Sequence, residues 1–147
     1  MIGRIQSELQ GSLRAGDRTR TNALRLLLSA LQKAEKDRPA GEFGGADEQA
    51  VLRRERKQRV EAAETYRAAG QEERAGAEEA DLPVIDEFLP APLSEAELES
   101  LVDAAVADSG ATSMRDMGAV MKLVSERSGG RADGRAASAL VRARLQT

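Results

Sequence analysis

The chain contains 147 residues, and its 22 basic and 25 acidic side chains give a formal net charge of −3. It has no His and no Cys, which excludes disulfide bonds, thiolate chemistry and the many catalytic arrangements that depend on an imidazole. Few residues are aromatic, whereas Ala, Glu, Leu and Arg, which favour helices or tolerate them well, dominate the sequence. The composition therefore predicts an all-α protein, built as one ordinary domain or two small ones.

The first part of the chain predicts two helices and a loop. Apolar residues recur every three or four positions in residues 2–13, which predicts an amphipathic helix that Gly16 ends. A Leu-rich second helix begins near Asp17, and its apolar residues cover more than one face. A flexible loop is expected at residues 38–45, where Pro39 lies near several glycines.

Two further helices are expected before the next prolines. Asp47 is expected to cap a third helix that continues to about Ala69. This helix is polar on nearly all sides, which is typical of a helix that is largely exposed or that supports a partner. A fourth helix, acidic and weakly patterned, is expected between Gln71 and Phe88.

Two prolines, Pro90 and Pro92, mark the expected domain boundary, because proline interrupts a helix. An N-terminal helical domain of about four helices is expected at 1–90, and a compact three-helix domain at 91–147. The three C-terminal helices are short and amphipathic, so they must pack together to bury their apolar stripes. Their expected caps are Ser94 with Glu97, Ser113 with Asp116, and Asp133. The stripe of the middle helix is expected to include Met114, Met117 and Met121.

A basic, glycine-rich turn in the C-terminal domain is the main candidate binding site. Gly129 and Gly130 precede the expected cap at Asp133, and glycines let backbone N–H groups approach an anion closely. Arginine binds phosphate in a bidentate manner, so this turn predicts contact with a phosphate backbone. The candidate residues are Arg115, Lys122, Arg127, Gly130, Arg131 and Arg135.

Purely structural interpretations stay open for this turn and for a second basic segment. In the structural interpretation of the turn, the glycines end one helix, Asp133 caps the next, and the arginines only keep the surface soluble. The second segment is a strip of Arg53, Arg56 and Lys57 on the third helix, without an aromatic residue to stack on a base. Its alternative is a solvated helix face on which Lys57 forms a weak ion pair with Glu61.

No catalytic residue, metal site or cofactor site is predicted. The acidic pairs Glu72–Glu73 and Glu78–Glu79 have the chemistry to hold Mg²⁺, but nothing in their spacing fixes a geometry. No segment approaches the roughly 20 apolar residues that span a bilayer, and the N-terminus lacks the apolar run of a signal peptide. We therefore expect a cytoplasmic protein without membrane contact.

Four C-terminal segments have a recognisable sequence: Leu93–Glu95, Gly110–Gly118, Val120–Lys122 and Gly130–Gly134. They resemble the YqeY family, which is similar to the C-terminal tail domain of the B subunit of tRNA-dependent amidotransferases. The resemblance continues upstream and covers nearly the whole chain, through Leu24–Leu27, Lys57–Arg59, Tyr66–Gly70 and Phe88–Pro90. One departure is at the basic turn, where the amidotransferase tail commonly has Lys and Pro and this chain has Arg131 and Gly134.

The resemblance implies two helical domains and an association with tRNA, because the tail domain of the amidotransferase helps to hold the tRNA. It does not imply the amidation reaction, since the catalytic body and the glutamine-splitting centre have no counterpart in this sequence. The leading hypothesis is a non-catalytic protein that contacts tRNA or another structured RNA through backbone phosphates. Two alternatives stay open: a helical adaptor for a protein partner, and an accessory factor of glutamine-dependent tRNA amidation, a carbon–nitrogen ligase reaction.

Overall fold

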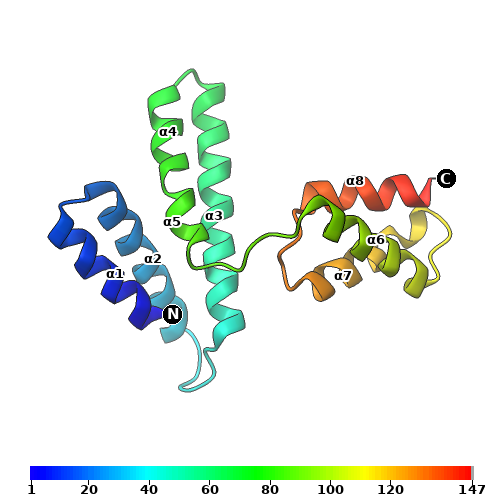
Figure 1. The fold of residues 1–147 in the computed structure, drawn as a ribbon, viewed down its shortest axis with the longest axis horizontal. Helices are drawn as coiled ribbons and strands as arrows, with labels where there is room; N and C mark the ends of the chain where they lie inside the picture. The colour runs from blue at the N-terminus through cyan, green and yellow to red at the C-terminus, as the bar shows by residue number, and fades with distance from the viewer. Residues whose placement is uncertain (147) are drawn as a thin grey trace. The chain divides into compact units, whose positions relative to one another are not determined.

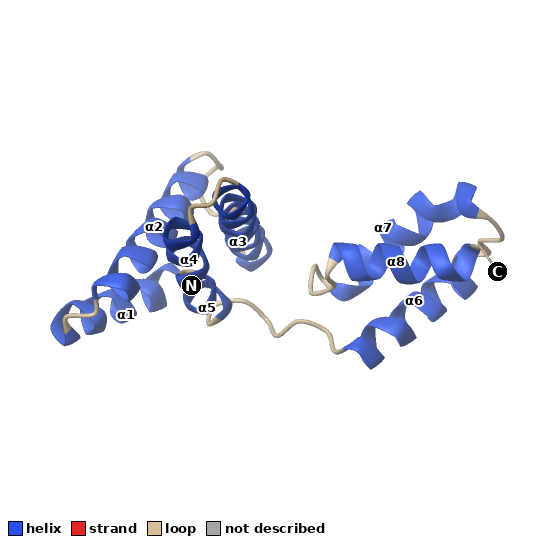
Figure 2. Ribbon diagram, turned by 90° about the horizontal axis from the view of Figure 1, so that it is seen from above, coloured by secondary structure: helices blue, strands red, loops and turns tan. Residues whose placement is uncertain are grey.

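The computed structural model describes residues 1–146, which are helical apart from connecting loops and contain no strand (Figures 1 and 2). This confirms the predicted all-α class. The chain divides into two compact units, Met1–Leu89 and a second that begins at Pro90. Thr147, the last residue of the expected C-terminal domain, lies outside the described residues. The two units are described one at a time.

The N-terminal unit consists of two helical hairpins and one short helix. In chain order its helices are α1 (Ile2–Ala15), α2 (Arg18–Lys36), α3 (Gly45–Ala68), α4 (Glu72–Ala80) and α5 (Leu82–Asp86). Gly16 ends α1 in the left-handed conformation, with a φ of 71°, and the Asp17 carboxylate caps α2 by accepting a hydrogen bond from the Arg20 N–H. The predicted end of the first helix at Gly16 and the predicted start of the second near Asp17 are confirmed.

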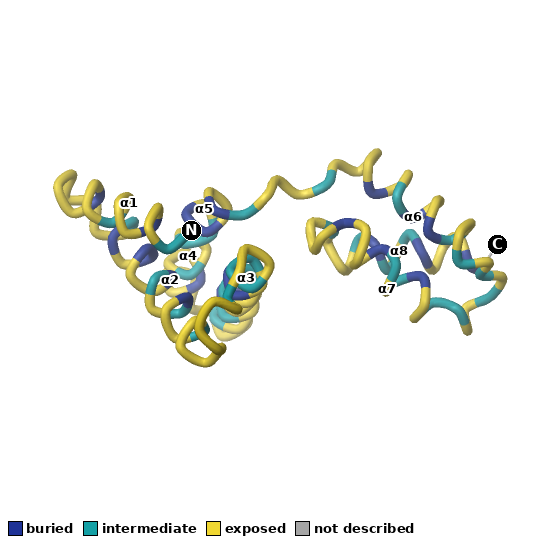
Figure 3. Tube along the Cα trace, turned by 90° about the horizontal axis from the view of Figure 1, so that it is seen from below, coloured by how far each residue is buried: buried dark blue, intermediate teal, exposed yellow. Residues whose placement is uncertain are grey.

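The core of this unit lies between α1, α2, α3 and α5. Leu24, Leu27 and Leu31 of α2 are fully buried, which explains why this helix has the densest apolar pattern in the sequence. Buried faces of the helices point toward one another, whereas the outer faces are exposed (Figure 3). A buried hydrogen bond of 2.9 Å between the hydroxyls of Ser12 and Thr21 joins α1 to α2 inside this apolar contact.

Two predictions for the N-terminal helices need correction. Helix α3 begins at Gly45, and Asp47 lies inside its first turn, where the carboxylate accepts a hydrogen bond from the Gly44 N–H. The expected fourth helix is divided at Asp81 into α4 and α5. Pro83 lies at the start of α5, where a residue without an N–H is tolerated, and it cannot continue the hydrogen-bond ladder of α4.

The C-terminal unit packs its helices around one small apolar core. It contains α6 (Glu95–Ser109), the short 3₁₀ helix η1 (Met114–Asp116), α7 (Met117–Ser128) and α8 (Gly134–Leu145). Val102, Val120, Val124 and Val141 are fully buried. The side chains of Ser94 and Asp133 cap α6 and α8 as predicted.

The start of the middle helix differs from the expectation. The residues from Met114 to Asp116 form the 3₁₀ turn η1, and α7 begins only at Met117. The Met114 side chain is therefore exposed, whereas Met117 and Met121 are partly buried against the core. The Asp116 carboxylate holds this start by accepting hydrogen bonds from the N–H groups of Thr112 and Ser113.

Within residues 1–146, no helix combines the length and the apolar character that crossing a membrane requires.

Candidate nucleic-acid interface

The glycine turn between α7 and α8 is built by two consecutive residues in the left-handed conformation. Gly129 has a φ of 60° and Gly130 a φ of 78°, which a side chain would strain. The Gly129 N–H bonds to the Glu126 carbonyl and the Gly130 N–H bonds to the Ser125 carbonyl. These amides therefore end α7 and are not directed at a ligand, so Gly130 is explained by the turn itself.

The N-terminus of α8 is also satisfied from within the chain. The Asp133 carboxylate accepts a hydrogen bond of 3.1 Å from the Arg135 N–H. A carboxylate at this position already interacts with the positive end of the helix dipole, which is the interaction that a phosphate would otherwise make. Any phosphate contact near this turn therefore depends on side chains rather than on the backbone.

Arg131 is the best-anchored cation at the turn. Its carbonyl accepts a hydrogen bond from the Leu93 N–H, and its side-chain Nε donates to the Ser128 carbonyl at 3.1 Å. The side chain is exposed, and its terminal nitrogens make no hydrogen bond or ion pair within residues 1–146. The guanidinium is thus positioned by one bond while its two outer nitrogens keep their donors for a ligand.

Arg127 has a different role from the one the sequence predicted. One of its terminal nitrogens lies 2.8 Å from a carboxylate oxygen of Asp108, which joins α7 to the end of α6. This ion pair neutralises the charge that a phosphate would meet. We therefore leave Arg127 out of the phosphate-binding set.

Lys122 and Arg115 are exposed but do not gather at the turn. Lys122 and Arg127 are five positions apart on α7, which separates their directions by about 140° around the helix axis. Arg115 lies in η1, at the opposite end of the 12-residue helix α7, so about 18 Å of helix separates it from Gly129. The six predicted residues are consequently spread over the unit, and only Arg131 and Arg135 adjoin the start of α8.

One further cation extends the site along α8. Arg142 is exposed and lies seven positions after Arg135, so the two side chains project from nearly the same side of the helix, about 10 Å apart along its axis. Ala139 lies between them and is also exposed. Arg142 can be identified from the helical period in the sequence, but it was not among the predicted residues because it lies outside the glycine turn.

The second predicted basic segment serves mainly to hold the N-terminal unit together. Arg56 of α3 forms an ion pair with Asp86 of α5, with 2.7 Å between Nε and a carboxylate oxygen. Arg53 donates a hydrogen bond to Gln49, one turn earlier on the same helix. Lys57 lies 3.8 Å from Glu61 in the weak, exposed pair that the structural alternative predicted.

Helix α3 also contains a buried charge that its polar sequence conceals. Arg59 is only 8% exposed, and its guanidinium donates to the carbonyl and the carboxylate of Glu55 at 3.2 and 2.8 Å. Its Nε lies 3.4 Å from a carboxylate oxygen of Asp81 without hydrogen-bond geometry. Arg59 thereby fixes the point at which α4 ends and α5 begins.

Three other arginines link one helix to another, and the hydrogen bonds that form these links shift pKa values. The hydrogen bond that Arg20 donates to Glu87 raises the pKa of the guanidinium, as does a second bond to Glu8. Arg67 binds Glu79 and Glu72 of α4, and these bonds raise the pKa of Arg67 and lower that of Glu79. The acidic pairs of α4 are therefore partly engaged with arginine. In the C-terminal unit the ion pair with Asp103 raises the pKa of Arg144.

These features define a helical protein of two units. In the C-terminal unit, Arg131 and Arg142 are exposed and form no ion pair within residues 1–146. The family model described as Yqey-like protein matches residues 2–145, so the chain belongs to this family. The predicted family membership is thus confirmed. No curated protein matches the chain in sequence.

Proposed function

We propose that the protein is non-catalytic and contacts tRNA or another structured RNA through backbone phosphates, using its C-terminal unit. The observation that carries this proposal is the line of exposed arginines formed by Arg131, Arg135 and Arg142 at the start and on the outer side of α8. Its second support is the resemblance of this unit to the tRNA-associated tail of the amidotransferase B subunit. The proposal places the protein in the cytoplasm, where tRNA is found.

The chemistry of the line suits phosphate better than it suits bases. Guanidinium groups donate two parallel hydrogen bonds to a phosphate, and α8 presents no aromatic side chain on which a base could stack. From Thr112 onward the chain has seven basic and three acidic residues, so the segment that contains α7 and α8 is the part of this unit that attracts a polyanion, whereas α6 is acidic. Recognition would follow the shape of the RNA rather than its sequence.

Charge reversal tests the proposal directly. The variant R131E/R135E should bind a folded tRNA transcript at least about tenfold more weakly than the natural chain in a filter-binding assay at 50 mM salt. The matched control is R115E/K122E, which changes the net charge equally in the same unit but away from α8, and it should lose much less affinity. Circular dichroism should show unchanged helix content in both variants.

Several results would count against the proposal. Unchanged affinity in R131E/R135E, or equal losses in both variants, would remove α8 from the interface. If the natural chain bound no RNA and instead recovered one stoichiometric protein in a pull-down, the adaptor function would replace this one. If it bound no RNA but stimulated a purified amidotransferase, the accessory function would replace it.

A further inference from the structure

We propose that the outer face of α2, in the N-terminal unit, is a second and separate binding surface for the phosphate backbone of folded RNA. This face, called the α2 basic face here, is formed by Arg18, Arg25, Lys33 and Lys36. It goes beyond the proposed function of the C-terminal unit and does not depend on it. In the sequence of α2, the leucines form a more prominent pattern than these basic residues.

The helical period brings these four cations onto one side. Arg25 follows Arg18 by seven residues and Lys36 follows it by 18, so the three side chains project within about 20° of one direction. Lys33 lies about 60° to one side. The buried Leu27 projects about 180° from Arg18, so the cations lie opposite the face that packs in the core.

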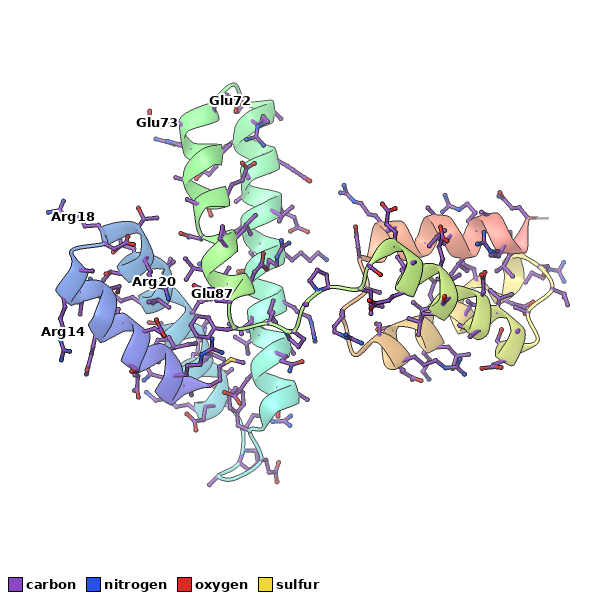
Figure 4. All side chains as sticks on the ribbon, in the orientation of Figure 1. Arg14, Arg18, Arg20, Glu72, Glu73 and Glu87 are labelled. Carbon is purple, nitrogen blue, oxygen red and sulfur yellow. The ribbon has the colours of Figure 1, made fainter. Side chains whose placement is uncertain are left out.

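The charges on this face are not used by the fold. All four side chains are exposed, and within residues 1–146 none of them takes part in a hydrogen bond or ion pair. Arg20, on the packed side of the same helix, shows the opposite behaviour, since it pairs with Glu8 and Glu87 (Figure 4). Arg18 extends away from the helices at the α1–α2 turn, and Arg14 of α1 does so at the same end (Figure 4).

Acidic residues are nearly absent from this surface. Helix α2 contains no Asp or Glu from Arg18 to Ala34. Glu35 projects about 100° from the line of cations, the Asp17 carboxylate is engaged in capping, and Asp37 follows the last turn. Electrostatic repulsion between this face and a polyanion is therefore small, and the basic side chains attract the polyanion along the whole helix.

The same face offers hydrogen bonds between its charges. Asn22, Ser29 and Gln32 are exposed and project within about 40° of the cation line. Amide and hydroxyl groups of this kind bind phosphate oxygens and ribose 2′-hydroxyls, which the shallow minor groove of RNA displays. The line from Arg18 to Lys36 is about 27 Å long.

A groove beside this face lies between α2 and α3, and its lining includes three basic and three acidic side chains. The groove has a volume of about 700 Å³, with Lys33 on its α2 side and Arg54 on its α3 side. Two of its other charges are neutralised within the unit, because Arg38 pairs with Asp47. Arg54 itself is exposed and makes no ion pair or hydrogen bond within the described chain.

An anionic membrane is the main competing ligand for a basic helix face. The observations favour RNA, because the centre of the α2 basic face contains polar side chains rather than the bulky apolar ones that enter a bilayer. Leu26 is the exposed apolar residue of α2, and it lies about 80° from the line of cations. A single leucine at the flank does not form the apolar half of a membrane-binding helix.

The test uses full-length protein, an RNA hairpin, a DNA hairpin of the same sequence, and vesicles of phosphatidylcholine with phosphatidylserine. The variant R25E/K36E should bind the RNA hairpin at least about tenfold more weakly at 50 mM salt, with a log–log salt slope that is shallower by about two. The matched control K57E/R74E carries the same change in net charge on other helices of the unit, and its affinity should change less than about threefold.

The outcomes separate this proposal from that for the C-terminal unit. Loss of RNA affinity in R25E/K36E beyond its control supports the α2 basic face, whether or not R131E/R135E also loses affinity. Loss in R131E/R135E alone overturns the α2 proposal and leaves the other intact. Three other results would each overturn the α2 proposal. They are equal losses of affinity in R25E/K36E and K57E/R74E, a preference for the DNA hairpin, and an effect of R25E/K36E on vesicle binding alone. The neutral variant R25Q/K36Q guards against a folding defect, because it should show the same direction of change with unaltered helix content.

Discussion

The N-terminal and C-terminal units use basic residues in the same two ways, with some that join helices and others that are exposed on one helix. In the N-terminal unit, Arg20, Arg56, Arg59 and Arg67 each join helices or turns through carboxylates. Four exposed cations without an ion pair within residues 1–146 lie on one face of α2. In the C-terminal unit, Arg127 and Arg144 join α7 and α8 to α6, and three further arginines are exposed at the start of α8 and along it. The comparison teaches that a run of basic residues does not by itself mark a binding surface. What matters is which charges the fold has already neutralised.

The largest effect is expected from the core that supports the α2 basic face. Leu27→Ala removes a fully buried side chain and should lower the free energy of unfolding of the N-terminal unit by about 2–5 kcal/mol. The adjacent control Leu26→Ala, at a position 52% exposed, should change it by less than about 0.5 kcal/mol. Urea unfolding followed by the fluorescence of Tyr66, the chain's single tyrosine, reports this unit alone. Equal effects of both substitutions would contradict the assigned orientation of α2.

The next effect tests the structural use of arginine on α3. Arg59→Ala leaves Glu55 and Asp81 without their cation in a largely buried site, and it should cost about 3 kcal/mol in the same assay. Lys57→Ala, two positions earlier in a pair that is 77% and 61% exposed, should cost less than about 0.5 kcal/mol. A small effect at Arg59 would show that its ion pairs are dispensable.

A smaller effect is expected at the glycine turn of the C-terminal unit. Gly129→Ala places a side chain at a φ of 60° and should destabilise this unit by about 1 kcal/mol, although nothing lies near the added methyl group. The control Gly118→Ala, in the first turn of α7, should stabilise the unit by up to about 1 kcal/mol because alanine favours a helix. Thermal unfolding followed by circular dichroism measures both, and effects of the same sign would contradict the turn geometry.

The smallest effect concerns pH. Arg67 lowers the pKa of Glu79 below its ordinary value of 4.5, so the folded state binds this proton less readily than the unfolded state. The stabilisation from this pair is therefore complete above the ordinary pKa and is lost as the pH falls through the lowered, folded-state pKa. The difference in melting temperature between the natural chain and Arg67→Gln should be present at pH 7 and should shrink below pH 4.5. A difference that stays constant down to pH 3 would exclude this origin.

Much of the fold follows from local rules in the sequence. Single residues are sufficient to place several helix ends, because each has a conformational or capping role that acts within one turn. These residues are Gly16, Asp17, Ser94 and Asp133. The division at Asp81 was not predicted, although Pro83 is a local signal for it. The contact of Asp81 with Arg59 of another helix is not visible in the sequence.

The candidate site was less predictable for the same reason. Arg127 appeared available because its partner Asp108 is 19 positions away on α6, beyond the reach of any local pattern. The glycine turn appeared to be an anion cradle, but its amides are used to end α7. The α2 basic face and Arg142, in contrast, follow a helical period that is visible in the sequence. The apolar stripe of α2 and the glycine turn before α8 are the more prominent patterns in these segments of the sequence.

The most direct test of the account is the salt dependence of RNA binding by the natural full-length chain. Its affinity for a folded tRNA transcript, measured by filter binding between 50 and 200 mM salt, should fall along a straight log–log line with a slope of about −0.7 to −0.9 for each phosphate contacted. Several contacts should give a decrease of at least about tenfold over this range. Absence of a complex at low salt, or an affinity that does not change with salt, would contradict the claim that exposed arginines bind the RNA backbone.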